Sequence, residues 1–344
     1  MHVFASNPKD IQEVCQLLRK GEVVGVPTET VYGLAADALH AEAVDRIFHI
    51  KGRPLHNPLI IHIGTASSAD RYVRVNATAQ RLMDAFWPGP LTLVLPKRNC
   101  IPDNVTAGLS TVGIRCPRHP ALQKILQCLD RPLAAPSANP SNYLSPTRVE
   151  HVVEHLKGRL QWVLDGGPCE RGVESTILDL TDPQHIQLLR PGPLSLESLE
   201  QVAGTSIASR NEPATSDSED SAAARTSPGQ MALHYSPRTP LRLLTAGASS
   251  SAIEAGKAPV ARVHFSDQAA AHCSESPTEH HFFLTHQEEA KEAEHNLYAL
   301  LQQIDHGDFS EIRIDPIPEG SAWNALRDRL TRASARRCSP NDER

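Results

Sequence analysis

The feature that most constrains this chain is a regular alternation of short apolar runs with amphipathic helical patterns up to Gly204. The first helix is predicted from Asn7 to Gly21, because Asn7 can cap it, Pro8 suits its first turn, and glycine ends it. Strands that alternate with helices indicate an α/β domain. The expected strands are Val23–Pro27, Leu59–Ile63, Leu91–Leu95, Pro132–Ala135, Gln161–Leu164, Ser175–Leu180 and His185–Leu189, and the further helices are Ala41–Ile50, Ala77–Phe86, Pro120–Leu129 and Thr147–Leu156.

The alternation stops at a polar stretch. From Ser206 to Ser227 almost no large apolar residue occurs, so this segment cannot bury enough surface to offset its ordering entropy. Apolar strand patterns return at 241–244, 260–263 and 312–314, with a helical pattern at Glu288–Ile304. With 344 residues, two globular units are expected. We predict one domain over 1–204, a linker or lid over 205–238, a smaller α/β domain over 239–336 and a tail over 337–344.

Composition narrows the class of protein. No apolar run approaches the roughly 20 residues that span a bilayer, and the first residues lack a secretory pattern, so a cytoplasmic protein is expected. The seven cysteines never form Cys-x-x-Cys, which argues against a disulfide framework or a cysteine-rich zinc site. Basic and acidic residues balance within the first domain, so neither domain is a basic nucleic-acid arm.

Polar residues gather where predicted strands end, which is where α/β sheets usually bind ligands. Pro27-Thr28-Glu29-Thr30-Val31-Tyr32-Gly33-Leu34 follows the strand at Val23. A threonine hydroxyl here can also simply cap a turn. Taken alone, the octapeptide leaves both interpretations open.

A pair of cations follows the helix at Ala41–Ile50. Lys51 and Arg53 lie on a stretch predicted to be non-helical, where both can face a polyphosphate, and Pro54 and Pro58 stiffen the segment. Alternatively, cations near a helix C-terminus only complement its dipole. Three more polar segments end predicted strands: Ser110–Pro117 with Arg115, Ala135-Pro136-Ser137-Ala138-Asn139 with Ser145-Pro146-Thr147, and Gly172–Ile177 with Arg190-Pro191-Gly192. We interpret Thr147 as a plain helix cap.

Two histidine patterns are set aside. His151 and His155 have the spacing of an inverted zinc-protease motif, but no third ligand is apparent. His280 and His281 are interpreted as a solvated loop. No P-loop and no Gly-x-Gly-x-x-Gly occurs, so ATP would need a phosphate-binding site of another kind.

In combination, these motifs resemble the YrdC-like domain of the threonylcarbamoyl-AMP synthase family from Gly21 to Gly192. Ser227-Pro228-Gly229-Gln230 and His234-Tyr235-Ser236-Pro237 are similar to the segment that joins this domain to a small C-terminal domain in the long form of the family. Glu319–Gly320 and Arg327–Leu330 with Ala333 also resemble that form. The resemblance implies a twisted mixed sheet with flanking helices around a concave cleft, followed by a smaller Rossmann-like domain.

The resemblance also implies an activity. ATP, L-threonine and bicarbonate would yield threonylcarbamoyl-AMP and pyrophosphate, for modification of transfer RNA. A magnesium ion would accompany ATP through ligands that the sequence does not reveal, and tRNA and a downstream threonylcarbamoyl transferase complex are expected partners. Carried over by motif, the threonine-binding residues are Thr30, His62, Arg115, Ala135 and Ser175, and the ATP-binding residues are Lys51, Arg53, Asn57, Thr111, Ser137, Asn139, Ser145, Arg190 and Tyr235, with Lys51 and Arg53 also in the catalytic role.

Two other functions fit related domains. A non-catalytic module that binds double-stranded RNA is the main alternative, although the chain lacks the positive surplus such binding uses. A carbamoyl-transferring maturation factor would also carry zinc-finger cysteine pairs, which are absent from this sequence.

Overall fold

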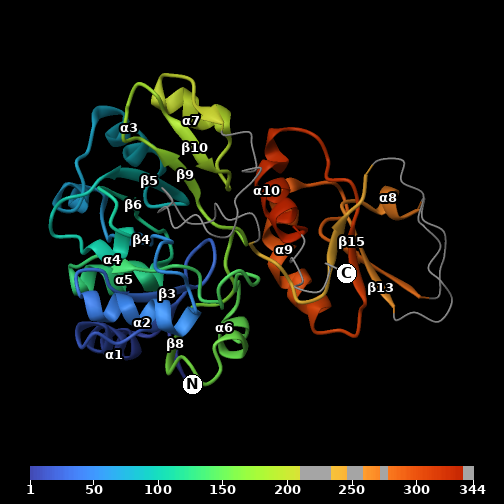
Figure 1. Ribbon diagram of the computed structural model, residues 1–344, viewed down its shortest axis with the longest axis horizontal. Helices are drawn as coiled ribbons and strands as arrows, with labels where there is room; N and C mark the ends of the chain where they lie inside the picture. The colour runs from blue at the N-terminus through green and yellow to red at the C-terminus, as the bar shows by residue number, and fades with distance from the viewer. Residues whose placement is uncertain (210–233, 246–258, 272–277, 336–344) are drawn as a thin grey trace, which may run out of the picture. The chain divides into compact units, whose positions relative to one another are not determined.

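The computed structural model describes residues 1–209, 234–245, 259–271 and 278–335 (Figure 1). It divides into two compact units, Met1–Ser141 with Ser145–Gln230, and Asn142–Leu144 with Met231–Arg344. Most of the predicted linker, the motif at 227–230 and the predicted tail lie outside the described residues. Within the described ranges, no helix is both long and apolar enough to cross a bilayer.

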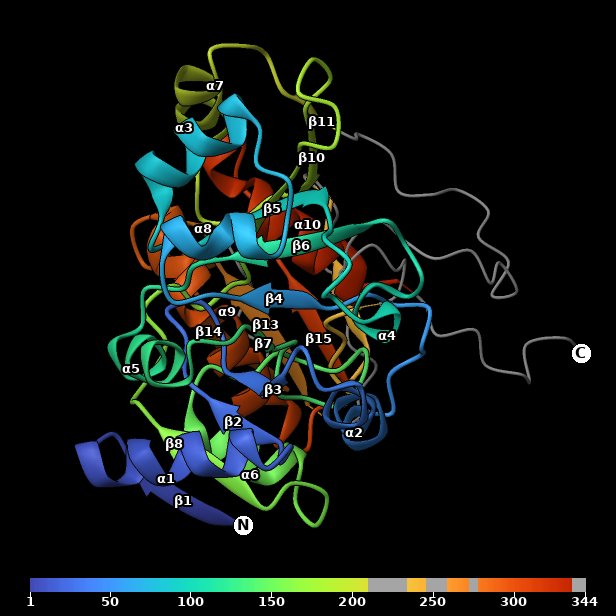
Figure 2. The ribbon, with the colours of Figure 1, turned by 90° about the vertical axis from the view of Figure 1, so that its left-hand side faces the viewer.

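The first unit is built on a mixed eleven-stranded sheet with the order β1-β8-β2-β3-β7-β4-β6-β5-β9-β10-β11. Figure 2 shows these strands climbing the unit from β1 and β8 to β5 and β10. The twisted mixed sheet that the resemblance implied is therefore confirmed. The strands are β1 (His2–Ala5), β2 (Val24–Val26), β3 (Gly33–Asp37), β4 (Ile60–His62), β5 (Leu91–Pro96), β6 (Thr111–Arg115), β7 (Leu133–Ala134), β8 (Trp162–Asp165), β9 (Thr176–Asp179), β10 (Gln187–Arg190) and β11 (Ala208–Ser209).

Helices cover this sheet with their apolar sides. In α1 the Asn7 side chain accepts a hydrogen bond from the Asp10 amide at 3.0 Å, and Pro8 opens the helix, as predicted. Ile11, Val14 and Leu18 of α1 are buried in one core cluster together with side chains of β2 and α5. The helices are α1 (Pro8–Arg19), α2 (Ala41–Lys51), α3 (Ala77–Phe86), α4 (Asp103–Thr106), α5 (Pro120–Leu129), α6 (Val149–His155) and α7 (Leu196–Ala203), with a 3-10 turn η1 at Ala66–Arg71.

Two local predictions in this unit were wrong. Lys51 is the last residue of α2 and not part of a non-helical stretch, because the left-handed turn that ends the helix comes one residue later, at Gly52. Thr147 does not cap α6, which begins at Val149 with no side-chain cap. The Thr147 amide instead donates a hydrogen bond to His151 Nδ1 at 3.2 Å.

The second unit is smaller. Its sheet is parallel throughout in the order β12-β15-β13-β14, so the predicted smaller α/β domain is confirmed. Ala261, Val263, Ile312 and Ile314 alternate along the central strands and are buried, as one covered face of a sheet requires. The elements are β12 (Leu241–Leu243), β13 (Val260–His264), α8 (Asp267–Ala271), β14 (Glu279–Phe283), α9 (Ala290–Asp305), β15 (Glu311–Ile314), η2 (Ser321–Trp323) and α10 (Asn324–Ala333).

His280 and His281 are exposed, as the interpretation of a solvated segment expected, but they lie in a strand and not in a loop. Both lie in β14, which pairs with β13 in parallel. His281 Nδ1 is 2.8 Å from His264 Nε2, and His264 Nδ1 is 2.6 Å from Asp315 Oδ2. This hydrogen-bonded chain joins His281 to the buried side chains of His264 and Asp315.

Candidate active site

One row of polar side chains crosses neighbouring strands of the first unit. In the sheet register His62 of β4 lies opposite Arg115 of β6, and Arg115 lies opposite Thr92 of β5. Directly paired residues project to the same face, so these three side chains line one strip of the sheet. Ser175, just before β9, continues the strip through a 2.8 Å hydrogen bond between its hydroxyl and that of Thr92.

Arg115 is the most constrained member of this strip. Its Nε donates to the Gly89 carbonyl at 3.2 Å, and one terminal nitrogen donates to Thr30 Oγ1 at 2.9 Å. The other terminal nitrogen lies 2.7 Å from Glu29 Oε1, in an ion pair whose side chains are only 5% and 3% exposed. Burial alone would raise the pKa of Glu29, but the charge and hydrogen bond of Arg115 lower it overall. Glu29 is therefore the internal counter-ion of Arg115.

The hydroxyl of Thr30 lies between Thr28 and Arg115. Thr28 Oγ1 accepts from the amides of Thr30 and Val31 at 3.0 and 3.1 Å, and it lies 2.7 Å from the Val31 carbonyl oxygen. In the 2.8 Å contact between the two threonine hydroxyls either oxygen can be the donor, and Thr30 also accepts from Arg115 at 2.9 Å. Thr28 thus closes the turn, as the simpler interpretation of this segment held, while Thr30 joins this turn to Arg115.

His62 is a neutral polar group in this strip. Burial lowers its pKa to about 3, and the neighbouring charge of Arg115 acts in the same direction. Its Nδ1 is buried and has no hydrogen-bond partner within the described residues. A neutral imidazole with an unused ring nitrogen is suited to a polar ligand atom.

The two predicted phosphate-binding cations are buried and held by carbonyl groups. Lys51 Nζ donates to the carbonyls of Ser137 and Asn139 at 2.5 and 2.6 Å, which joins the end of α2 to the segment 137–139. Burial lowers the pKa of Lys51 well below its usual value, and the charge of Arg53 lowers it further. Arg53 donates to the Asn57 carbonyl, the Asn57 side chain and the Pro58 carbonyl at 2.7–3.0 Å. The sequence motif therefore folds as one preformed cationic corner.

A second arginine is held beside Ser175. Arg190, at the end of β10, donates from Nε to the Ser175 carbonyl at 3.0 Å and from a terminal nitrogen to the Ser175 hydroxyl at 3.1 Å. The Ser145 hydroxyl donates to Glu174 Oε1 at 2.6 Å. Ser145 and Arg190 are thus linked to adjacent residues of one segment, although 45 positions separate them in the chain.

The remaining predicted residues are spread around these groups. Ala135 follows β7, and its amide donates to the Ile60 carbonyl at 3.2 Å. Thr111 begins β6 and is half-buried. Tyr235 belongs to the second unit, where Arg329 lies over its ring at 5.2 Å.

Sequence reasoning missed Glu29, Thr92 and Glu174 as contributors. Glu29 and Glu174 lay inside the motifs already singled out, yet no role was given to them. Thr92 was hidden in the apolar run of β5, where it is the lone polar side chain among Leu91, Leu93, Val94 and Leu95. The available signal in the sequence was a single hydroxyl residue within an apolar run, because a hydroxyl buried there needs a hydrogen-bond partner.

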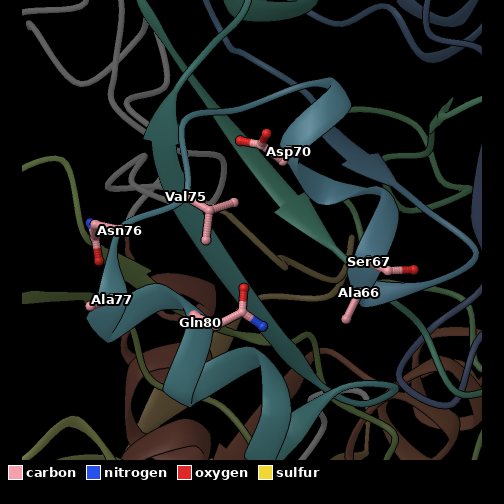
Figure 3. Close-up of a pocket in the computed structure, with 7 residues that line it drawn as sticks. All are labelled: Ala66, Ser67, Asp70, Val75, Asn76, Ala77 and Gln80. Carbon is pink, nitrogen blue, oxygen red and sulfur yellow. The ribbon is translucent and has the colours of Figure 1, made fainter.

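A separate hollow of about 320 Å³ lies between η1 and the start of α3 (Figure 3). Ser67, Asp70 and Gln80 give it polar walls, but Asp70 is already paired with Arg98 at 2.7 Å. None of the predicted site residues lines it. The polar strip and the cationic corner therefore remain the candidate active site.

Comparison with known proteins assigns the family. A family profile described as "Telomere recombination" matches residues 16–192, and one described as "Threonylcarbamoyl-AMP synthase, C-terminal domain" matches residues 194–335. Curated threonylcarbamoyl-AMP synthases align with this chain at 47% identity in Pyrococcus abyssi (64% of this chain, 63% of that protein), 43% in Bacillus subtilis (70% and 68%) and 31% in Schizosaccharomyces pombe (94% and 88%). The chain belongs to the threonylcarbamoyl-AMP synthase family.

Solved structures agree with this assignment over both units. The H234A/Y235A variant of Pyrococcus abyssi Sua5 matches with a TM-score of 0.82 at 32% identity, covering 97% of this chain and 96% of that one. Pyrococcus abyssi Sua5 complexed with L-threonine matches with a TM-score of 0.81 at 32% identity, covering 97% and 98%. The resemblance to the long form of the threonylcarbamoyl-AMP synthase family is thus confirmed, and with it a nucleotidyltransferase class of enzyme.

Proposed function

We propose that this chain is an L-threonylcarbamoyladenylate synthase that condenses L-threonine, bicarbonate and ATP into threonylcarbamoyl-AMP and pyrophosphate. The observation that carries the proposal is the buried strip of His62, Arg115 and Ser175 in a chain of the threonylcarbamoyl-AMP synthase family. A related Pyrococcus structure holds L-threonine. The alternative of a non-catalytic RNA-binding module has no support from the relatives.

Threonine is a zwitterion, and the strip offers matching groups. Arg115 can pair with the carboxylate, since a guanidinium recognises carboxylates through charge-assisted hydrogen bonds. The Thr30 hydroxyl can bond the amine or hydroxyl of threonine, and the unused Nδ1 of His62 can bind a further polar atom. Ala135 would contribute backbone and Ser175 its hydroxyl. Glu29 keeps this pocket electrically balanced before the substrate arrives.

ATP would bind beside this pocket, at the cationic corner and at Arg190. Once protonated, Lys51 has three donors, and the one beyond the two carbonyl bonds would bind a phosphate oxygen. Asn57, Thr111, Ser137, Asn139 and Ser145 would complete the nucleotide site, with Tyr235 as a contribution from the second unit.

The chemistry calls for positioning and not for a protein nucleophile. The threonine amine captures bicarbonate with loss of water, or carbon dioxide with loss of a proton, to give a carbamate. A carbamate oxygen then attacks the α-phosphate, the bond from that phosphorus to the bridging oxygen breaks, and pyrophosphate leaves. Alignment of reactants alone can lower such a barrier by about 7–11 kcal/mol. Lys51, Arg53 and Arg190 would orient the phosphates and balance their charge as the transition state forms.

Magnesium fits as a companion of ATP. Within the described ranges no three His, Cys, Asp or Glu side chains form a metal-binding group. Magnesium commonly keeps several waters and binds through substrate phosphates, so the residues present suit an ion carried by ATP. When bound, it would neutralise phosphate charge, while Lys51 and Arg53 hold the phosphates in place.

The product suggests partners and a location. A mixed anhydride of a carbamate with AMP reacts readily with water, so a transferase complex that modifies tRNA is the proposed consumer. We place this reaction in the cytoplasm, where tRNA is modified. The predicted lid over 205–238 would protect the anhydride from water.

The decisive experiment measures pyrophosphate release with ATP and magnesium while threonine or bicarbonate is omitted in turn. Release must require both co-substrates. Lys51→Met should lower the rate about 10- to 100-fold, the effect of losing one charged hydrogen bond. The matched control is Lys124→Met, which removes an exposed lysine of α5 and should leave the rate unchanged. Release that needs neither co-substrate, or none at all from folded protein, would reject the proposal.

A further inference from the structure

Thr92 stands out among the groups around the strip because nothing yet assigns it a role. It is fully buried in the middle of the sheet, opposite Arg115 in the β5–β6 register. Its hydroxyl lies 2.8 Å from that of Ser175. A buried threonine in an otherwise apolar strand needs a reason, because valine would pack equally well there.

The donor in the contact between the Thr92 and Ser175 hydroxyls follows from the hydrogen bonds that each group can make. Arg190 can only donate, so its 3.1 Å bond occupies one lone pair of the Ser175 hydroxyl. The bond between Ser175 and Thr92 allows either direction. In either direction one hydroxyl hydrogen has no acceptor in the described part of the chain. If Ser175 donated, that hydrogen would belong to Thr92, which is fully buried inside the sheet, so no ligand could satisfy it. If Thr92 donates, the hydrogen belongs to Ser175, which faces the proposed threonine pocket, so a substrate oxygen can accept it. With substrate bound, only donation from Thr92 to Ser175 satisfies both hydroxyls.

This assignment determines what Ser175 can offer a ligand. Arg190 and Thr92 occupy both lone pairs of its oxygen, so only its own hydrogen remains. Ser175 can then donate to an oxygen of the substrate but cannot accept from an amine or hydroxyl. Ser175 is thus suited to the acidic end of an amino acid and not to its amino end.

We infer that Thr92 is a positioning residue that orients the Ser175 hydroxyl as a hydrogen-bond donor to a carboxylate or carbamate oxygen of the substrate. This inference rests on the proposed function. Thr92 acts only through Ser175, because its own hydroxyl is buried beneath it. The same bond network ties Ser175 to Arg190, so the orientation of the serine is coupled to a cation proposed to face ATP.

Conservative substitutions test this directly. Thr92→Val keeps the branched shape and removes the hydroxyl, while Thr92→Ser keeps the hydroxyl. We expect Thr92→Val to lower kcat/KM for threonine about tenfold, the effect of one misaligned hydrogen bond, with KM for ATP unchanged. Thr92→Ser should retain activity near that of the wild type. A higher KM for threonine would identify the carboxylate as the oxygen that Ser175 bonds. A lower kcat would identify the carbamate instead.

A double-mutant cycle separates positioning from general structural damage. In a Ser175→Ala background, Thr92→Val should cause no further loss, because the group it orients is gone. Thr106→Val is the matched control, since it removes another fully buried threonine hydroxyl that bonds Lys97 instead. Full activity of Thr92→Val, or an equal loss with and without Ser175, would overturn the inference. If wild-type release does not depend on threonine, the proposed function itself has failed, and that failure is visible before any variant is compared.

Discussion

At the scale of single residues, the ion pair between Glu29 and Arg115 should be the most costly contact to break. Both side chains are almost fully buried, so removing one charge leaves the other uncompensated. We expect Glu29→Gln to lower the free energy of unfolding by about 3–5 kcal/mol. Denaturant titration measures this. Glu170→Gln is the control: its pair with Arg118 has the same 2.7 Å separation but is roughly half exposed, and should change stability little.

The same pair sets a dependence on pH. The pKa of Glu29 is lowered in the folded chain, so its stabilising contribution is fully present above the unfolded value of about 4.3. That contribution is lost as the pH falls through the lowered folded value. The stability difference between wild type and Glu29→Gln should therefore shrink only in acid. A difference that stays constant to low pH would contradict the assignment.

Lys51 provides a separate test through proton uptake. Burial lowers its pKa, and a bound phosphate would raise it again by supplying negative charge. Binding of ATP should then draw in a proton at pH values below the usual lysine value of about 10.4 but above the lowered one. Calorimetry in two buffers with different ionisation enthalpies reports the uptake. Lys51→Met should abolish it, and an unchanged uptake in that variant would assign the proton to another group.

At the scale of elements, the approach of β9 to the turn after β10 is very close. A Cβ atom on Gly192 would lie 2.4 Å from the Thr176 amide nitrogen and 2.8 Å from the Glu174 carbonyl oxygen. Both neighbours are backbone, so they cannot yield as a flexible side chain would. Gly192→Ala should displace the segment that carries Ser175 and lower kcat/KM for threonine at least tenfold. Gly158→Ala is a useful control, because open space surrounds that position and any loss there reflects its left-handed backbone alone.

Elements with strong local signals were predictable from the sequence. The helices at α3 and α5 match their predicted bounds, since periodicity and caps act within a few residues. β3 was missed because Gly33–Asp37 is buried throughout and shows no alternation. The bonds of Glu29 to Arg115 and of Thr92 to Ser175 join residues more than 80 positions apart. Local patterns carry no information on strand register, so these contacts required the structure.

At the scale of the whole molecule, each unit has its own buried core. In the first, helices and the large sheet enclose a cluster that includes Leu34, Ile61 and Leu93, and in the second Leu297 and Ile312 are fully buried. Units with separate cores can unfold in separate transitions. All five proposed threonine-binding residues belong to the first unit.

L-threonine should therefore stabilise the first unit alone. A ligand that binds only the folded state adds about 2.7 kcal/mol at a concentration 100 times its Kd. In differential scanning calorimetry, threonine should raise one transition and leave the other where it was, and Ser175→Ala should reduce the shift. If threonine raised a single transition of the entire chain, the two cores would unfold cooperatively, and the second unit would share the energy of substrate binding without contributing a threonine ligand.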